Sequence, residues 1–221
     1  MSILTLNNVC YKYAGARKEV LKDITIDFEE GKVYTIVGKS GAGKSTILFL
    51  LAGLDCPTGG SIIYHQKDMK ELDRDEYRAK NIGVIFQDYN LLTTATAIDN
   101  VILSMDISEY RKKNKKEYAY QILQKVGIDN ETANRKVLKL SGGEQQRIGI
   151  ACAISHKPNI IIADEPTGNL DKETEQNIME ILTSLAHEEK RCVIVVTHSR
   201  SVAAYADELW GLNQGRLTFI K

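Results

Sequence analysis

Cysteine is scarce in this sequence of 221 residues, and its four cysteines stand far apart. Cys10, Cys56, Cys152 and Cys192 form no CxxC pair. The spacing therefore argues against a zinc site and against the disulfide framework of a small secreted protein. We expect the four cysteines to behave as small apolar side chains that pack in the interior. We also expect a reducing, cytoplasmic location.

Long apolar runs are also missing. The longest, Ile47–Leu54, is interrupted by Gly53 and is far shorter than the roughly 20 residues that cross a bilayer. The first ten residues have neither the basic start nor the apolar block of a signal peptide. We expect no direct insertion into a membrane, so any action on a membrane requires a partner protein.

Net charge is absent as well, because 29 basic residues balance 29 acidic ones. A neutral chain has no long-range field that would draw it onto nucleic acid or anionic lipid, so we predict no nucleic-acid partner. The basic run at residues 111–116 (RKKNKK) is most simply a solvated turn, with a local nucleic-acid or lipid contact as the lesser alternative.

What the sequence does contain is an alternation of strand-like and helical segments. Short apolar runs with β-branched residues at both odd and even positions are typical of strands buried on both faces of a parallel sheet. Four runs fit this pattern: Val33–Val37, Ile82–Phe86, Ile160–Ala163 and Val193–Val196. Helical spacing of apolar residues occurs at 119–126 and 177–185. The sequence therefore predicts an α/β fold with helices on both faces of a parallel sheet.

Two segments depart from this alternation. Residues 1–28 contain strand-like runs joined by a turn at Ala14-Gly15, which predicts an antiparallel β-layer beside the core. Residues 90–140 are helix-like and polar, without a buried strand, which predicts a helical insertion. We expect one domain over 1–221, with residues 1–89 and 141–221 as the core and about 90–140 as a helical subdomain.

The most informative motif lies at residues 38–45, GKSGAGKS, which fit the phosphate-loop pattern G-x-x-x-x-G-K-[ST]. The motif follows the strand Val33–Val37 and opens the helical run Thr46–Leu51. Small residues let successive backbone N–H groups curl around a phosphate at the positive end of a helix. Lys44 is expected to bind the β- and γ-phosphates, and Ser45 to ligate Mg²⁺. An ordinary glycine-rich turn is the weaker alternative in this context.

A pair of carboxylates ends the strand at Ile160–Ala163. Parallel strands present their carboxyl ends at the edge of the sheet where α/β proteins bind ligands. Asp164 is expected to hold hydrated Mg²⁺, and Glu165 to orient or deprotonate an attacking water. On its own such a pair is more often a helix cap, and only the phosphate loop makes the catalytic interpretation strong.

A second anion-binding segment is predicted at residues 140–147, LSGGEQQR, where Ser-Gly-Gly opens another helix. One bound nucleotide does not need two such cradles from the same chain. The string resembles the signature sequence of ABC ATPases, and nearly the whole chain is similar to that family. The resemblance implies a P-loop NTPase (RecA-like) core and the binding and hydrolysis of ATP with Mg²⁺.

The resemblance also implies roles for residues that carry no signal alone. Tyr13 would stack on adenine, the alternative being a packing tyrosine. Gln87 would contact Mg²⁺ and couple to a membrane subunit, His198 would contact the γ-phosphate, and residues 169–171 would cross to a partner. The implied catalytic residues are Glu165, His198, Gln87 and Lys44; the metal ligands are Ser45, Gln87 and Asp164. The implied nucleotide contacts are Tyr13, Gly38, Ser40, Gly41, Ala42, Gly43, Lys44, Ser45, Thr46, Ser141, Gly142, Gly143 and Glu144.

In ABC ATPases two subunits meet head to tail, and each ATP lies between the phosphate loop of one and the signature of the other. This arrangement explains two cradles in one chain and implies a second ATPase subunit, here most simply an identical copy. Residues 53–58, 86–92 and 163–171 resemble the macrolide-exporter, lipoprotein-release and antimicrobial-peptide-resistance group. That group implies a separate transmembrane permease and a peripheral place on the inner face of the membrane.

The group also implies export or extraction of amphipathic compounds. A cell-division type of ABC ATPase, which signals through a membrane partner without transport, remains an alternative. A soluble ABC ATPase of DNA repair or translation is disfavoured, because 221 residues leave no room for its usual extra modules. We expect the permease to dock near residues 88–105, on the apolar residues Leu91, Leu92, Ile98, Val101, Ile102 and Leu103, unless these residues only pack the insertion's own core.

Overall fold

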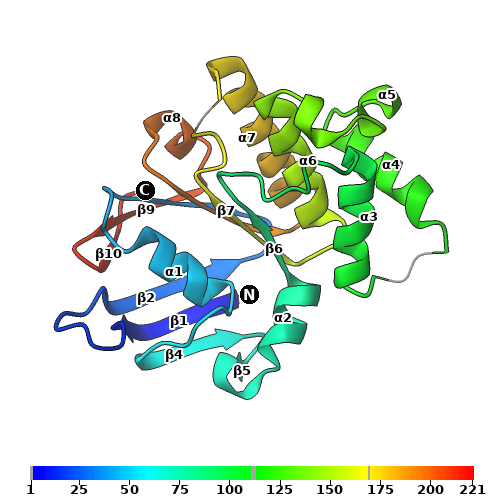
Figure 1. Ribbon diagram of the computed structural model, residues 1–221. Coiled ribbons are helices and arrows are strands. Elements are labelled where there is room, and N and C mark those ends of the chain that lie inside the picture. Colours follow the sequence, from blue (N-terminus) through cyan, green and yellow to red (C-terminus); the bar gives the residue numbers. More distant parts are fainter. Residues whose placement is uncertain (1, 111–112, 169) are drawn as a thin grey trace.

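The computed structural model describes residues 2–110, 113–168 and 170–221, and two β-sheets organise them. The larger sheet has six strands in the order β10-β9-β3-β8-β7-β6 (Figure 1). All its neighbouring strands run parallel except the pair β9 and β10. The strands are β3 (Val33–Val37), β6 (Ile82–Ile85), β7 (Ile160–Asp164), β8 (Cys192–Thr197), β9 (Glu208–Asn213) and β10 (Arg216–Phe219).

The second sheet is antiparallel and has the order β2-β1-β4-β5. Its strands are β1 (Ser2–Tyr11), β2 (Leu21–Glu29), β4 (Gly59–Tyr64) and β5 (Lys67–Asp68). The predicted N-terminal β-layer is therefore present, and it recruits a hairpin from residues 59–68. Strands β4, β5, β9 and β10 were not predicted from the sequence, because they are short or only half-buried and lack a continuous apolar run.

Both faces of the parallel sheet are buried, as its β-branched strands require. Along β8, Ile194 and Val196 face the core shared with the antiparallel sheet, whereas Val193 and Val195 face a helical layer. All four side chains are fully buried. Each contributes about 1.5–3 kcal/mol relative to an exposed position, so the sheet is stabilised from two sides.

Helices cover the two faces unequally. The helix α1 (Lys44–Leu51) packs in the core between the two sheets and contacts β7 and β8. It begins two residues before the predicted helical run. On the opposite face lie α6 (Gly142–Ile154) and α7 (Lys172–His187) (Figure 1). Three short helices complete the core: α2 (Arg74–Asn81), α8 (Arg200–Ala203) and the 3₁₀ turn η1 (Met69–Glu71).

The segment 90–140 forms a helical layer beyond α6. It contains α3 (Ala97–Ile107), α4 (Lys115–Lys125), α5 (Asn130–Ala133) and the 3₁₀ turn η2 (Val137–Lys139). A capping box of Thr96 and Asp99 starts α3. The buried residues of α3 and α4 join the core cluster of α6, α7 and the sheet. Whether the segment is a separate subdomain, with boundaries near 90 and 140, stays a prediction.

Two results bear on the surroundings of the protein. In the ranges the structure describes, no helix is long and apolar enough to span a lipid bilayer. Part of the basic run, residues 111 and 112, lies outside the described residues.

Candidate active site

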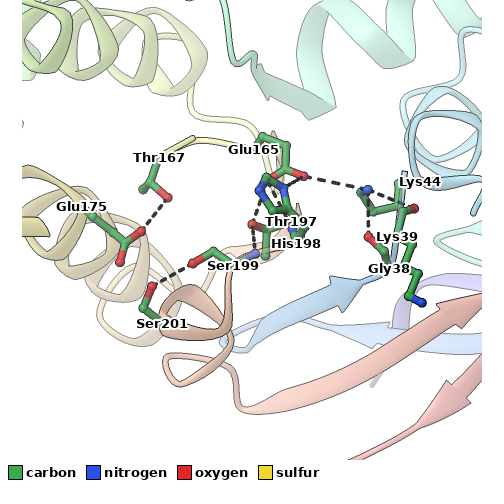
Figure 2. A network of polar contacts seen from close by, with 10 residues as sticks. All are labelled: Gly38, Lys39, Lys44, Glu165, Thr167, Glu175, Thr197, His198, Ser199 and Ser201. Carbon is green, nitrogen blue, oxygen red and sulfur yellow. Dashed lines mark hydrogen bonds and ion pairs between the residues drawn. The ribbon is translucent and has the colours of Figure 1, made fainter. Parts of the chain in front are cut away.

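The predicted catalytic segments meet at one edge of the parallel sheet. The strands β3, β8 and β7 are neighbours, and their carboxyl ends lead into the phosphate loop, His198 and Glu165 respectively. Figure 2 shows the side chains of Lys44, Glu165 and His198 turned toward one another. The sheet thus brings Lys44 and Glu165 together, although they are more than 120 positions apart in the sequence.

The phosphate loop has a backbone that only small residues permit. Gly41 and Gly43 have φ values of +76° and +108°, in the region that favours glycine. A methyl group on Gly43 would also lie 2.9 Å from Cδ2 of Leu21. Gly43 caps α1 without a side chain, so no side chain competes for the amides of the first turn. A helix end with such free amides is suited to bind an anion.

Lys44 holds its ammonium group over this loop. Its Nζ donates to the carbonyl of Gly38 at 2.9 Å and to that of Lys39 at 3.4 Å (Figure 2). The same Nζ lies 3.9 Å from Oε1 of Glu165. The cation is therefore fixed between the loop that would hold phosphates and the candidate base.

Glu165 is the centre of the polar network. Its Oε1 accepts a hydrogen bond from Nδ1 of His198 at 2.8 Å. Its Oε2 accepts from the hydroxyl of Thr197 at 2.8 Å and from the main-chain N–H of His198 at 3.3 Å. The residue has a φ of +45°, a strained value of the kind that clusters at functional sites.

Thr197 was not predicted from the sequence. The last residue of β8, it is only 1% exposed, yet its hydroxyl contacts the candidate base. The only available signal was a hydroxyl at the end of an apolar strand, directly before His198.

The candidate metal ligands Ser45, Gln87 and Asp164 suit Mg²⁺ better than they suit a metal that takes most of its ligands from the protein. Burial, and then the neighbouring Glu165, raise the pKa of Asp164, so a cation at this place would relieve a carboxylate that is costly to ionise. Ser45 directly follows Lys44 in the sequence and is exposed. Gln87 lies against Gly168, in the loop after β7. Among the described residues, no group of three or more His, Cys, Asp or Glu side chains could hold a metal ion. Mg²⁺ needs few protein ligands because it keeps waters and binds phosphates.

Tyr13 stands beside the phosphate loop. Its ring is 45% exposed, and its hydroxyl lies 2.9 Å from Oγ1 of Thr46 in α1. The ring of Tyr11 packs edge-on against it with the centroids 4.9 Å apart. Tyr11 in turn donates to Asp55, which raises the pKa of Tyr11 to about 12. Tyr13 is therefore partly open to solvent next to the predicted triphosphate site.

The signature residues form a separate group. Ser141 is the N-cap of α6, and its hydroxyl contacts Oε2 of Glu144 at 2.8 Å in a capping box. Glu144 also accepts from the N–H of Ser141 at 2.7 Å. Gly142 and Gly143 pack against Tyr89 and Thr174. Within the described ranges, no hydrogen bond or ion pair joins residues 141–144 to residues 38–46.

The predicted nucleotide contacts therefore divide into two places in the same chain. The phosphate loop, Asp164, Glu165, Gln87 and His198 share one sheet edge, with Tyr13 beside α1. Ser141 through Glu144 instead begin the helix α6. Asn169, the first residue of the predicted crossing loop, lies outside the described residues.

Comparisons with known proteins identify the family of this chain. A family model described as ABC transporter matches residues 21–168. The uncharacterized ABC transporter ATP-binding protein YclH of Bacillus subtilis (strain 168) is 44% identical, over 99% of this chain and 96% of YclH. The macrolide export ATP-binding/permease protein MacB of Aggregatibacter actinomycetemcomitans is 42% identical, over 91% of this chain and 31% of MacB.

A solved structure gives the same result for the fold. The ATP-binding cassette MJ0796, in a dimeric post-hydrolysis state bound to ADP and Pi, has a TM-score of 0.89 and is 34% identical. The match covers 99% of this chain and 98% of that cassette. The predicted P-loop NTPase fold is therefore confirmed.

Proposed function

Because the chain belongs to the ABC transporter family as a subunit that binds ATP with Mg²⁺ and hydrolyses it, we propose that it powers a separate transmembrane permease that exports or extracts amphipathic compounds. Peptides, antibiotics and lipoproteins are the expected substrates. The similarity to MacB, a macrolide export protein with ATP-binding and permease parts, supports export. The extensive match to YclH, named as an ATP-binding protein, supports a separate ATPase chain. We place it at the inner face of the cell membrane.

The chemistry is assigned to this chain's own side chains. The phosphate-loop amides and Lys44 bind the β- and γ-phosphates, and the exposed ring of Tyr13 stacks on the adenine. Ser45, Asp164 and Gln87 would hold Mg²⁺, which neutralises phosphate charge when bound. Glu165 accepts a proton from the attacking water, and His198 turns its exposed ring to the γ-phosphate.

One observation carries the proposal that two copies act together: the separation of the two anion-binding helix ends. The exposed Ser141 at the start of α6 makes no polar contact with the phosphate loop of its own chain within the described residues. A second copy, turned head to tail, would bring its signature to this chain's phosphates. The ATP-binding cassette MJ0796 was solved as a dimer bound to ADP and Pi, which supports a pair of copies. We propose a homodimer with two equivalent sites.

Ser141→Arg tests the shared site. In a Glu165→Gln background, which should accumulate ATP-bound pairs, the added bulk and charge at the signature should abolish pairing. The measurement is size-exclusion chromatography with ATP. Loss of the helix cap should cost about 1 kcal/mol, which is about 2–4 °C in Tm for a chain of this size.

Thr96→Arg is the matched control, because Thr96 caps α3 through the same kind of capping box. It should lose a similar amount of stability and still pair on ATP. Normal pairing by Ser141→Arg would contradict the shared site, since a weakened helix cap is common to both variants.

A groove beside the site offers a place for the permease. It has a volume of about 520 Å³ and runs between β6, the loop after it, α3 and α6. Its apolar lining includes Leu91, Leu92, Leu103 and Ile107. The docking prediction is wrong for Ile98 and Val101, which are 3% and 0% exposed and pack the helical core. Leu92, Leu103 and Ile107 remain exposed, so an apolar segment of a partner can bury them.

Leu103→Glu tests this groove. We expect at least a tenfold loss of the membrane protein that co-purifies with the tagged chain from membranes, because a charge would be buried against an apolar partner. Ile220→Glu is the control, since Ile220 is also exposed but lies at the end of the chain, outside the groove lining. Equal recovery with both variants would place the permease elsewhere.

The identity of the recovered protein tests the transport proposal. A membrane protein with a large extracytoplasmic region and a reconstituted export or extraction activity would support transport. A membrane partner that moves no solute would instead favour the cell-division alternative, in which the ATPase signals through that partner.

A further inference from the structure

The two oxygens of the Glu165 carboxylate have different kinds of donor. Oε1 accepts from the His198 ring at 2.8 Å and has Lys44 at 3.9 Å. Oε2 accepts from the hydroxyl of Thr197 at 2.8 Å and from the His198 main-chain N–H at 3.3 Å. One oxygen is thus held by a ring and a distant ammonium group, and the other by groups close to the backbone.

These donors differ in their freedom to move. The side chain of His198 is 72% exposed, so its ring has room to turn away. Thr197 is 1% exposed, and its hydroxyl oxygen also accepts a hydrogen bond from the N–H of Ser199 at 3.0 Å. Because an ionised carboxylate can only accept, the Thr197 hydroxyl donates its proton to Oε2 of Glu165. Figure 2 shows this chain of contacts from Ser199 through Thr197 to Glu165.

The backbone at Glu165 makes such an anchor necessary. The chain leaves β7 at this residue with a φ of +45°, after its N–H has paired with the carbonyl of Val196. A glutamate side chain has several rotatable bonds, and fixing them costs conformational entropy. Without a fixed donor at one oxygen, the carboxylate would sample orientations that do not reach the substrate.

We propose that Thr197 is a positioning residue for hydrolysis: its hydroxyl anchors Oε2 of Glu165, so that Oε1 is the oxygen that takes the proton. This rests on the proposed function, in which Glu165 is the general base. When the His198 ring turns to the γ-phosphate, Oε1 becomes available to the attacking water. The water oxygen bonds to the γ-phosphorus, its proton passes to Oε1, and the bridging oxygen leaves on ADP with the bonding electron pair.

Two substitutions separate this role from simple packing. Thr197→Val keeps the shape and removes the hydroxyl, whereas Thr197→Ser keeps the hydroxyl and removes the methyl group. We expect Thr197→Val to lower kcat by about 10- to 100-fold, the loss typical of one hydrogen bond to a charged group. KM for ATP should change less than threefold, because the hydrogen bonds of the Thr197 hydroxyl among the described residues go to Glu165 and Ser199 and not to the phosphate loop. Thr197→Ser should keep kcat within about threefold of the original chain.

A packing role predicts the reverse order, with Ser more damaging than Val. That order, or an unchanged kcat in Thr197→Val, would overturn the proposal. Thermal melting of both variants checks that the loss of kcat is not a loss of folded protein. Glu165→Gln, measured in parallel, separates the positioning role of Thr197 from the assignment of Glu165 as the base. If Glu165→Gln is inactive and Thr197→Val is normal, only the positioning role fails. If Glu165→Gln keeps full activity, the assignment of the base fails.

Discussion

Replacing Glu165 by glutamine should reduce ATP turnover by about 10²- to 10⁴-fold, the range associated with loss of a general base. Its carbonyl oxygen can still accept from Thr197, so the side chain keeps its anchor. The amide cannot take a proton from water at neutral pH. ATP binding should be retained, because Lys44 and the phosphate-loop amides are unchanged. Single-turnover release of phosphate measures the first effect, and calorimetry measures the second.

Glu173→Gln is a suitable control. Glu173 lies in the first turn of α7, is exposed, and follows Glu165 by only eight positions. Glu173→Gln makes the same chemical change away from the sheet edge, so this variant should turn over ATP at the rate of the original chain. A normal rate in Glu165→Gln would remove Glu165 from its assigned role.

Replacing Lys44 by alanine should have the second large effect, a loss of roughly 10- to 150-fold in ATP affinity. A hydrogen bond to a charged group is worth about 1.5–3 kcal/mol, and tenfold in affinity corresponds to about 1.4 kcal/mol. The Lys44 side chain is only 13% exposed, and its Nζ already donates to a loop carbonyl, so little ordering is required when phosphate binds. Isothermal titration calorimetry with a non-hydrolysable analogue of ATP measures binding without turnover.

Lys39→Ala provides the matched comparison. Lys39 belongs to the same loop and carries the same charge, but it is exposed and its ammonium has no polar partner among the described residues. Its removal should change affinity by less than threefold, through screened long-range charge only. Equal losses in the two variants would mean that net charge, rather than the position of Lys44, governs binding.

Much of the site was predictable because short motifs report local backbone requirements. Glycines at 41 and 43 are needed where φ is positive, and carboxylates at 164 and 165 end a strand that its apolar residues already identify. The role of His198 needed a family resemblance, since one histidine after a strand has no chemical signal. The hairpins β4–β5 and β9–β10 were missed because their strands are short or half-buried, and because β4 and β9 also pair with the distant strands β1 and β3.

The sequence by itself determined the fold class, and it located the candidate phosphate loop, the candidate catalytic carboxylates and a second predicted anion-binding segment, because these depend on residue type and spacing along the chain. Only the tertiary structure decided which side chains meet. It buried Ile98 and Val101 while leaving Leu103 exposed, and it joined Thr197 to Glu165 across 32 positions. Such contacts are set by neighbouring parallel strands, whose order in the sheet differs from their order in the sequence.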